Sequence, residues 1–363
     1  MKIAIDIQTT LGKPTGFGFY VSNLVEALKD HIDGDFQLEL IEPGTEKDFS
    51  TPQRFIWDQF TYPTRAKQKK VDLIHQPCFS APLSFNGPVV VTIHDIISIL
   101  FPETIPFASR MFYSKWMPFS YRKAKQIITV SQSTKRDIVR VLGIPEEKIT
   151  VIPLGFDKKL EKVVSSQQIS NVKKKYKLPG KYLLHIGTLE PRKNLDFLIE
   201  VFADVVLDPK NSDLGLVITG KKGWYYEGLF EKVKRYNLQD RVVFTGYIDE
   251  EDKAAIYQGA QIFTFPSVYE GFGLPPLEAM ASGVPVISSD TSSMPEVIGE
   301  AGLLISPYDK KKWVEAISRV SQSPKLIQEM REKNKRQVAK FSWTKAAEKT
   351  LEVYKKAIMD DKK

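Results

Sequence analysis

Residues 265–287 read FPSVYEGFGLPPLEAMASGVPVI, and this stretch indicates the fold of the chain. It runs from an apolar strand through a glycine loop and a short helix into a second strand. Pro276 lies near the start of the helix and Gly283 follows its end, which is where Pro and Gly commonly occur in helices. Gly271 and Gly273 let the backbone approach a ligand closely, and the helix N-terminus that follows favours an anion such as phosphate. The stretch predicts one unit of an α/β sheet with an anion site in its loop.

Two carboxylates flank this predicted anion site, Glu270 in the loop and Glu278 near the helix start. A carboxylate readily accepts hydrogen bonds from a pair of sugar hydroxyls. Taken singly, Glu278 could be an acid that suits the helix dipole, and Glu270 a solvated loop residue. The two together, in this glycine context, favour a ligand-binding segment.

Outward from this segment, short apolar runs alternate with amphipathic stretches along the chain. Continuous apolar runs of this kind are typical of buried parallel strands. The expected strands of the first series are Ile3–Ile7, Phe36–Ile41, Leu73–His75, Val89–Ile93, Ile127–Val130 and Ile149–Ile152. Those of the second are Tyr182–Ile186, Leu216–Thr219, Val242–Thr245, Ile262–Phe265, Pro285–Ser288 and Leu303–Ile305. Each series predicts a doubly wound, Rossmann-like sheet with helices on both faces. The helical patterns between the strands include Phe19–Leu28, Phe107–Ala124, Ser133–Leu142, Leu195–Leu207, Tyr226–Tyr236, Asp249–Gln258, Pro276–Ala281 and Lys310–Ser321.

The domain organisation follows from the length and from one change in composition. A chain of 363 residues suggests two domains. Residues 157–180 are rich in lysine and end in Pro-Gly, which suits an exposed linker leading into a helix. We therefore expect an N-terminal lobe at 1–165, a C-terminal lobe at 166–340, and a last segment at 341–363 that contains an amphipathic helix, Trp343–Ile358. Two such lobes facing each other across a cleft would hold ligands at the carboxyl ends of their strands.

Composition excludes several classes of protein. Hydrophobic residues at 42% and charged residues at 26% indicate a globular chain rather than a disordered or fibrous one. A single cysteine, Cys78, excludes an intrachain disulfide and a four-thiolate zinc site. No apolar run approaches the ~18 residues that span a bilayer, and the start, MKIAIDI, is typical of a strand rather than a signal peptide. We expect a cytoplasmic protein, at the inner face of the membrane if it is peripheral.

The charge is uneven along the chain. The net charge is 52 − 44 = +8, and residues 101–180 alone hold 16 Lys and Arg against 6 Asp and Glu. Such a basic region suits nucleic acid, an anionic lipid surface or a phosphorylated substrate.

A second motif precedes the glutamate segment in the same predicted lobe. Residues 185–194 read HIGTLEPRKN and follow a predicted strand. Arg192 offers a planar guanidinium with paired N–H donors, and Lys193 offers a compact ammonium charge. Together they suit a diphosphate. An Arg-Lys pair by itself is usually solvated surface, but its place at the carboxyl end of a strand favours a functional role.

Together these motifs resemble family 4 of the retaining, nucleotide-sugar-dependent GT-B glycosyltransferases. The resemblance rests on GTLEPRKN and on the pair Glu270 and Glu278, separated by seven residues, in the context Gly-Phe-Gly-Leu-Pro. The N-terminal half agrees in order and spacing, so the resemblance runs from about residue 1 to 355; the matching segments are 15–20, 92–95 and 128–131. One departure is Phe19, where family members often have Arg.

The resemblance implies a GT-B fold and transfer of a hexose with retention of anomeric configuration, with no metal and no cofactor beyond the donor. It also implies that the helix within 341–363 crosses back to the N-terminal lobe. Its implied catalytic residues are Glu270, His94, Arg192 and Lys193. The two cations would bind the donor diphosphate, Glu270 a hydroxyl of the hexose, and His94 the donor sugar. Glu278 would bind the ribose, and Gly16 would close over the diphosphate. The implied substrate-binding residues are Gly16, Gly187, Thr188, Gly220, Tyr247, Gly271, Phe272, Gly273, Leu274 and Glu278.

The substrates are expected only as classes. The resemblance to O-antigen and mannan-type transferases favours GDP-mannose as donor, ahead of UDP-hexoses, and a glycan or lipid-linked acceptor. Two other functions stay open. One is another enzyme of this architecture, a nucleotide-sugar epimerase or a phosphorylase, although a phosphorylase would need a pyridoxal phosphate lysine and usually a longer chain. The other is an inactive, carbohydrate-binding homologue.

Three further signals favour ordinary structure over function. Asp33-Gly34-Asp35 has the Asp-x-Asp form of metal-dependent transferases, but it falls in a polar turn where these residues are expected. The four histidines show no metal-ligand spacing, so we expect no metal site. The basic residues 158–177 lack interleaved aromatics, so a solvated linker is favoured over a nucleic-acid site.

Residues Met111–Lys123 read MFYSKWMPFSYRK and combine aromatics with cations at helical spacing. Such a helix could lie on an anionic membrane as a peripheral anchor. It could equally be a core stripe whose cations reach outward to water.

Overall fold

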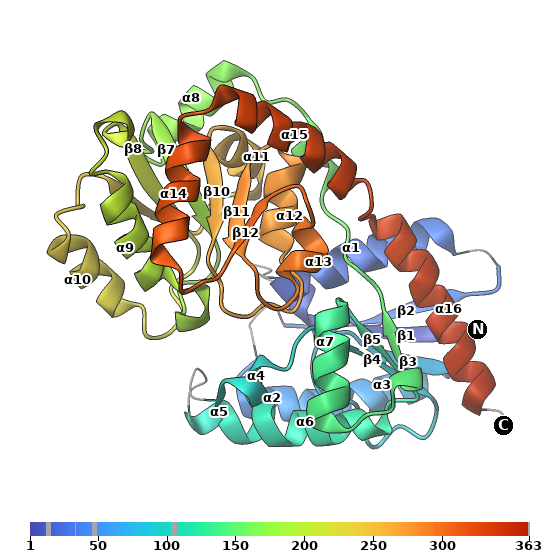
Figure 1. The fold of residues 1–363 in the computed structure, drawn as a ribbon. Helices are drawn as coiled ribbons and strands as arrows, with labels where there is room; N and C mark the ends of the chain where they lie inside the picture. Colours follow the sequence, from blue (N-terminus) through green and yellow to red (C-terminus); the bar gives the residue numbers. More distant parts are fainter. Residues whose placement is uncertain (12–15, 33, 46–48, 103–106, 362–363) are drawn as a thin grey trace. The chain divides into compact units, whose positions relative to one another are not determined.

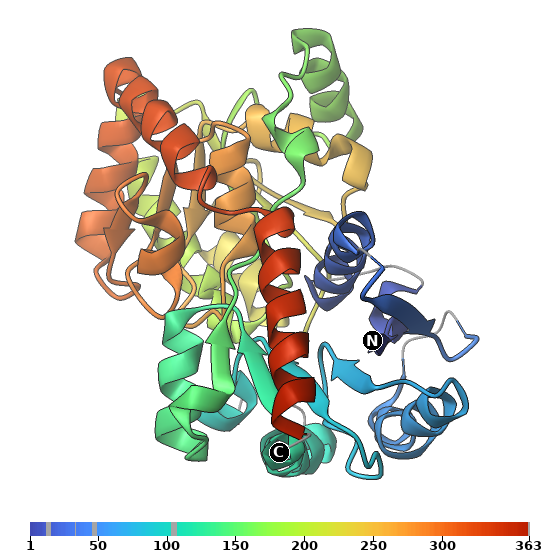
Figure 2. The ribbon, with the colours of Figure 1, turned by 90° about the vertical axis from the view of Figure 1, so that its right-hand side faces the viewer.

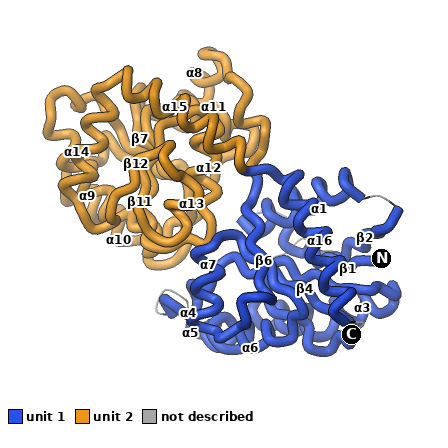
Figure 3. The backbone as a smooth tube through the Cα atoms, turned by 45° about the vertical axis from the view of Figure 1, so that its right-hand side comes forward, with its two compact units in different colours: residues 1–155, 341–363 blue, residues 156–340 orange. Residues whose placement is uncertain are grey.

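The computed structural model describes residues 1–11, 16–32, 34–45, 49–102 and 107–361. The chain divides into two compact units (Figure 3). Unit 1 comprises Met1–Gly155 and Phe341–Lys363, and unit 2 comprises Phe156–Lys340. Each unit is a Rossmann-like α/β layer structure, so the predicted fold class is confirmed at this level. Thr15 and Asp33, of the glycine loop and the Asp-x-Asp signal, lie outside the described residues.

Unit 1 is built on a six-stranded parallel sheet in the order β2-β1-β3-β4-β5-β6. Its strands are β1 (Lys2–Asp6), β2 (Gln37–Ile41), β3 (Leu73–Gln76), β4 (Val89–Ile93), β5 (Gln126–Thr129) and β6 (Ile149–Val151). All residues of β3, β4 and β5 are buried, because helices cover both faces of the sheet (Figure 1). This double burial explains why the strands appear in the sequence as continuous apolar runs.

The helices of unit 1 include two long stretches interrupted by π turns. The first consists of α2 (Thr51–Ile56), η2 (Trp57–Thr61) and α3 (Tyr62–Gln68), and the second of α5 (Phe107–Met111), η4 (Phe112–Trp116), α6 (Met117–Ser120) and η5 (Tyr121–Lys123). The others are α1 (Gly16–His31), α4 (Ile97–Leu100), α7 (Gln132–Asp137) with η6 (Ile138–Leu142), the short turns η1 (Gln8–Thr10) and η7 (Glu146–Lys148), and α16 (Trp343–Asp361).

The last helix, α16, packs within unit 1, the lobe in which the family resemblance places it. It contacts α1, β4 and β5, and Figure 2 shows it in red across this unit. Its buried side chains include Ala347, Tyr354 and Ile358. Gly155 lies against the Trp343 backbone, where a Cβ would overlap it. Among the described residues, no helix is both long enough and apolar enough to cross a bilayer.

Unit 2 has a second six-stranded parallel sheet, in the order β12-β11-β10-β7-β8-β9. Its strands are β7 (Lys181–Ile186), β8 (Leu214–Thr219), β9 (Val242–Gly246), β10 (Ile262–Phe265), β11 (Val286–Ser289) and β12 (Leu303–Ile305). Its helices are α8 (Ser166–Lys175), α9 (Leu195–Val205), α10 (Glu227–Arg235), α11 (Glu250–Gln258), α12 (Leu274–Ala281), α13 (Met294–Ile298), α14 (Lys310–Ser321) and α15 (Pro324–Val338). Three short helical turns, η8 (Lys158–Glu161), η9 (Pro191–Lys193) and η10 (Pro209–Asn211), complete it.

The structure corrects the interpretation of residues 157–180 as a solvated linker. Unit 2 begins at Phe156, ahead of the boundary expected at residue 165. The turn η8 contacts α11 and α12, with Leu160 buried, and α8 packs against α11. Lys175 pairs with Asp249 and Asp252, so this basic stretch belongs to the folded unit.

Candidate functional site

The order of strands in unit 2 places two loops side by side at one edge of the sheet. β7 and β10 are neighbours, with Ile262 opposite Leu183, and the chain moves outward from them in opposite directions. Ligands of open α/β sheets bind at such a switch point, outside the carboxyl ends of the strands. The loop after β7 carries Arg192 and Lys193, and the loop after β10 carries Glu270.

Backbone contacts hold these two loops together. Val268 N donates to Arg192 O at 2.9 Å, and Arg192 Nη1 donates to Tyr269 O at 3.3 Å. Asn194 adopts a left-handed conformation at φ 56°, which ends the turn η9 and starts α9. Its side-chain amide donates to Pro307 O at 2.9 Å and anchors the turn.

Glu270 forms ion pairs with both predicted diphosphate-binding cations. Glu270 Oε2 lies 2.6 Å from Arg192 Nη1, and Glu270 Oε1 lies 2.5 Å from Lys193 Nζ. Burial opposes ionisation of Glu270, but the two cations outweigh it and lower its pKa to about 2. Burial lowers the pKa of Lys193, and the neighbouring Arg192 adds to this effect. The three side chains form one charged cluster that is mostly buried.

Serine side chains from the loop after β11 fix the Glu270 loop in place. Ser292 Oγ accepts from Glu270 N at 2.9 Å. Ser293 Oγ lies 2.9 Å from Glu270 O and 2.6 Å from Phe272 O. Glu270 is therefore positioned by its backbone as well as by its ion pairs.

The glycine loop then turns into α12. Gly271 and Phe272 are buried, and Gly273 has φ 109°, a conformation that favours glycine. A Cβ at Gly273 would collide with the Met294 side chain. Leu274 is the first residue of α12, so the backbone N–H groups of these residues lie at a helix N-terminus, as the anion-site prediction requires.

Glu278 lies in α12 and has partners different from those of Glu270. Its Oε1 is 2.7 Å from Lys253 Nζ, and its Oε2 accepts from Tyr257 Oη at 2.9 Å. Burial opposes the charge on Lys253, but Glu278 and Glu250 raise its pKa above the usual value. Glu278 is thus a buried, fully partnered carboxylate.

The other substrate-binding candidates of unit 2 lie at the same edge of the sheet. Gly187 and Thr188 follow β7, Gly220 follows β8, and Tyr247 follows β9. Gly187 N donates to Thr219 O at 2.9 Å, which brings the loops after β7 and β8 together. Gly220 has φ 145°, and a Cβ there would overlap the Gly187 carbonyl.

The two candidates of unit 1 lie on different elements. Gly16 is the first residue of α1, so the predicted glycine loop forms the first turn of a helix that begins before the expected Phe19. His94 follows β4, and its Nε2 lies 2.9 Å from Pro77 O. Because a carbonyl only accepts, Nε2 carries the hydrogen. Burial lowers the pKa of His94 to about 4, so the ring is neutral at pH 7 and Nδ1 is an acceptor.

A chain of buried polar groups connects the His94 region to α16. The Tyr20 ring meets the His94 ring edge to face at 4.5 Å. Tyr20 Oη is 3.0 Å from Thr92 Oγ1, which is 2.9 Å from His75 Nε2. His75 Nδ1 is 2.7 Å from Tyr354 Oη of α16. The C-terminal helix therefore supports the element that carries His94.

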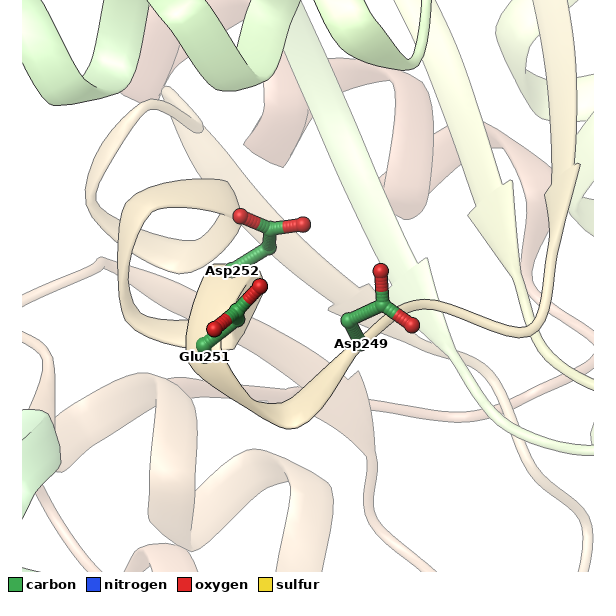
Figure 4. A group of neighbouring side chains, drawn as sticks. All are labelled: Asp249, Glu251 and Asp252. Atoms are coloured by element: carbon green, nitrogen blue, oxygen red, sulfur yellow. The ribbon is translucent and has the colours of Figure 1, made fainter.

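Carboxylates close enough together to share a cation occur, within the described ranges, at Asp249, Glu251 and Asp252 (Figure 4). Lys175 Nζ lies 2.8 Å from Asp249 and 2.6 Å from Asp252 and already neutralises them in part. The group is mostly exposed, and a cluster of this kind is common on protein surfaces without an ion.

Three residues of the site were missed by sequence reasoning, the buried Glu190 and Tyr257 and the partly buried Lys253. Glu190 Oε1 lies 2.5 Å from Arg192 Nε, whereas Glu270 pairs with Nη1 of the same guanidinium. Its position inside the GTLEPRKN motif was the feature of the sequence that could have indicated Glu190. Lys253 and Tyr257, the partners of Glu278, are four residues apart in a predicted helix and therefore share a face.

Comparison with known proteins identifies the family of the chain. Residues 166–337 match the family model described as glycosyl transferases group 1, and residues 21–160 match that of Glycosyltransferase Family 4. The chain is 33% identical to O-antigen chain mannosyltransferase B of Escherichia coli over 314 residues, which cover 84% of this chain and 77% of that protein. It is 28% identical to the serotype-specific mannosyltransferase WbdA of Escherichia coli, but the match covers only 33% of that protein and 72% of this chain.

Solved structures show the same fold at low sequence identity. Sucrose-phosphate synthase from Thermosynechococcus elongatus superposes with a TM-score of 0.78 and 21% identity, covering 99% of each chain. Anabaena HepE in complex with UDP-glucose superposes with a TM-score of 0.71 and 19% identity, covering 97% of this chain and 99% of that one. The two Rossmann-like units match the fold of these structures, and the family models and the relative at 33% identity show that the chain belongs to family 4 of the GT-B glycosyltransferases.

Proposed function

We propose that this protein transfers mannose from GDP-mannose to a hydroxyl of a glycan or lipid-linked acceptor, with retention of anomeric configuration. The named relatives support mannose, since both are mannosyltransferases. Binding of UDP-glucose by Anabaena HepE, which shares the fold, supports a nucleotide diphosphate sugar as the class of donor.

The observation that carries the proposal is the pairing of Glu270 with Arg192 and Lys193 at the switch point of the sheet. Anionic oxygens already lie between these cations at 2.5–2.6 Å. A diphosphate at the N-terminus of α12 would present oxygens of the same charge to the same groups. We assign the diphosphate to Arg192 and Lys193, the ribose hydroxyls to Glu278 and the hexose to Glu270. We also assign His94 to the donor sugar.

The proposed reaction takes place on one face of the sugar. The acceptor oxygen forms a bond to the anomeric carbon while the bond from that carbon to the diphosphate oxygen breaks. The proton of the acceptor hydroxyl passes to the leaving diphosphate. Arg192 and Lys193 would stabilise the negative charge that grows on the leaving group, the kind of effect that supplies roughly 2–4 kcal/mol per donor.

Two substitutions test the assignment of the diphosphate. Arg192→Ala and Lys193→Ala should each lower turnover about 30- to 1000-fold, the equivalent of roughly 2–4 kcal/mol. Lys234→Ala is the matched control, because Lys234 pairs with Glu231 on an exposed helix surface. Near-normal turnover in both site variants, with circular dichroism showing a folded chain, would refute the assignment.

Product analysis separates this function from its rivals. Incubation with GDP-mannose and a glycan acceptor should yield GDP and a new glycosidic bond whose α configuration is read by NMR. A changed sugar on an intact nucleotide would instead identify an epimerase, and binding without turnover an inactive homologue. We expect activity to survive a chelator, and loss that Mn²⁺ restores would contradict metal independence.

We also propose peripheral association with an anionic membrane at its cytoplasmic face. A lipid-linked acceptor would bring the enzyme to such a surface, and the basic residues of 101–180 suit it.

A further inference from the structure

Two helical stretches of unit 1 lie side by side on the outside of its sheet. They are residues 51–68 (α2, η2 and α3) and residues 107–123 (α5 to η5). Thr51 Oγ1 lies 2.9 Å from Ser109 Oγ, and the rings of Phe55 and Trp116 have centroids 5.1 Å apart. Figure 1 shows α2, α5 and α6 together along one edge of this unit.

Both stretches expose large apolar side chains on their outer faces. Phe107 is 84% exposed, Met111 73%, Phe60 57%, Ile56 54% and Phe119 53%. Ile56 and Phe60 are four residues apart, as are Phe107 and Met111, and Phe119 follows eight residues later. Side chains four residues apart are neighbours on a helix surface, and a row of ring contacts joins the two stretches, from Phe60 to Phe55 at 6.2 Å, from Phe55 to Trp116, and from Trp116 to Phe119 at 5.9 Å. The five exposed side chains are here called the outer apolar face.

The same helices also contribute to the core, as the core-stripe interpretation of Met111–Lys123 expects. Phe112 and Tyr121 are buried in unit 1, as are Trp57 and Tyr62 of the neighbouring stretch. Their apolar groups therefore divide into an inner set that packs on the sheet and the outer apolar face. Packing on the sheet accounts for the inner set, whereas the five side chains of the outer apolar face are more than half exposed.

The charges that accompany the outer apolar face have one sign. Residues 51–68 and 107–123 contain seven Lys and Arg and one acid, Asp58. Asp58 and its ion-pair partner Arg54 are both buried, so the six other charges are all positive. Lys115 lies four residues from both Met111 and Phe119, and Lys123 four residues beyond Phe119, so cations alternate with apolar groups along that face. An exposed helical face that combines apolar side chains with cations and lacks exposed acids matches an anionic bilayer surface.

We propose that the outer apolar face, together with Lys115 and Lys123, docks on a bilayer that contains anionic phospholipid. The apolar side chains enter the boundary between headgroups and acyl chains, and the cations contact the headgroups. This inference deepens the membrane association proposed above by naming the residues that make it, and it does not depend on the transferase reaction.

Sedimentation with vesicles tests the proposal. The full chain should bind vesicles of 30% phosphatidylglycerol in phosphatidylcholine, bind pure phosphatidylcholine weakly, and lose affinity as salt rises. Met111→Ser and Phe60→Ser should each lower partitioning about tenfold, and Lys115→Gln about fivefold. Leu207→Ser is the matched control, because Leu207 is 78% exposed in unit 2, and it should bind as the unchanged chain does.

Donor hydrolysis without vesicles keeps this test separate from the catalytic proposal. It should be unchanged in Met111→Ser and Phe60→Ser, since neither residue is assigned to the donor site. Vesicle binding with no transferase activity would uphold the docking face and reject the proposed reaction. Failure of the unchanged chain to bind anionic vesicles, equal loss in the Leu207 control, or self-association through this face in place of vesicle binding would overturn the inference.

Discussion

Replacing Glu270 by Gln removes one negative charge from between two cations while keeping the shape of the side chain. In the structure this carboxylate lies 2.6 Å from Arg192 Nη1 and 2.5 Å from Lys193 Nζ, largely out of water. Gln can still offer one acceptor oxygen, but it leaves the two cations without their shared counterion. Removing one partner of a buried ion pair is strongly destabilising, by about 3–5 kcal/mol.

The pKa of Glu270 gives a second, independent value for this loss in the free energy of unfolding. The cations lower it from 4.5 to about 2 in the folded chain. At about 1.4 kcal/mol per pKa unit, the ionised carboxylate contributes about 3 kcal/mol to the free energy of unfolding. Because the folded-state pKa is the lower one, this stability is complete above the unfolded-state pKa and is lost as the pH falls toward 2. The difference in stability between the unchanged chain and Glu270→Gln should therefore be about 3 kcal/mol at pH 7 and shrink between pH 5 and 2.

Urea unfolding of both chains across this pH range measures the difference directly. Glu231→Gln serves as the control, because the Glu231–Lys234 pair is exposed and should contribute less than about 1 kcal/mol. GDP should bind Glu270→Gln at least as tightly as the unchanged chain, since the diphosphate supplies the missing charge, while turnover falls. A Glu270→Gln chain as stable as the original at pH 7, or a deficit that does not vary with pH, would refute the reasoning.

Three further changes follow from contacts seen in the structure. Glu278→Gln should weaken GDP binding about tenfold, because hydrogen bonds to a charged group are worth about 1.5–3 kcal/mol, and calorimetric titration with unaltered affinity would reject the ribose assignment. Tyr354→Phe removes the hydroxyl bonded to His75 and should lower the free energy of unfolding by about 1–3 kcal/mol in urea titrations, so an unchanged midpoint would show that this bond adds no stability. Gly220→Ala should destabilise the chain by more than about 2 kcal/mol because its Cβ has no space. The control, Gly228→Ala, lies at an open helix position and should be neutral or stabilising. Similar melting temperatures for the two variants would contradict the crowding at residue 220.

The regular elements were largely predictable from local pattern. Every strand expected from an apolar run is present, with ends that differ by no more than two residues, because strands covered on both faces must be apolar throughout. The helical elements that were not predicted include the stretch 51–68 and α15. The first is interrupted by a π turn, which breaks the usual spacing. The second buries the amides of Asn334 and Gln337, which donate to backbone carbonyls, so its inner face is partly polar.

The candidate site likewise has a part that local sequence predicts and a part that depends on contacts between distant segments. By itself, the sequence determined that two glycine-containing loops with Arg192, Lys193, Glu270 and Glu278 follow strands, since short-range spacing is enough for that. Only the tertiary structure decided that Glu270 pairs with Lys193, 77 residues earlier in the chain. That contact exists because β10 packs beside β7, a choice of neighbours made by the packing of the whole sheet and its helices. A residue's partners across such a distance depend on which strands become adjacent, and no local pattern encodes that order.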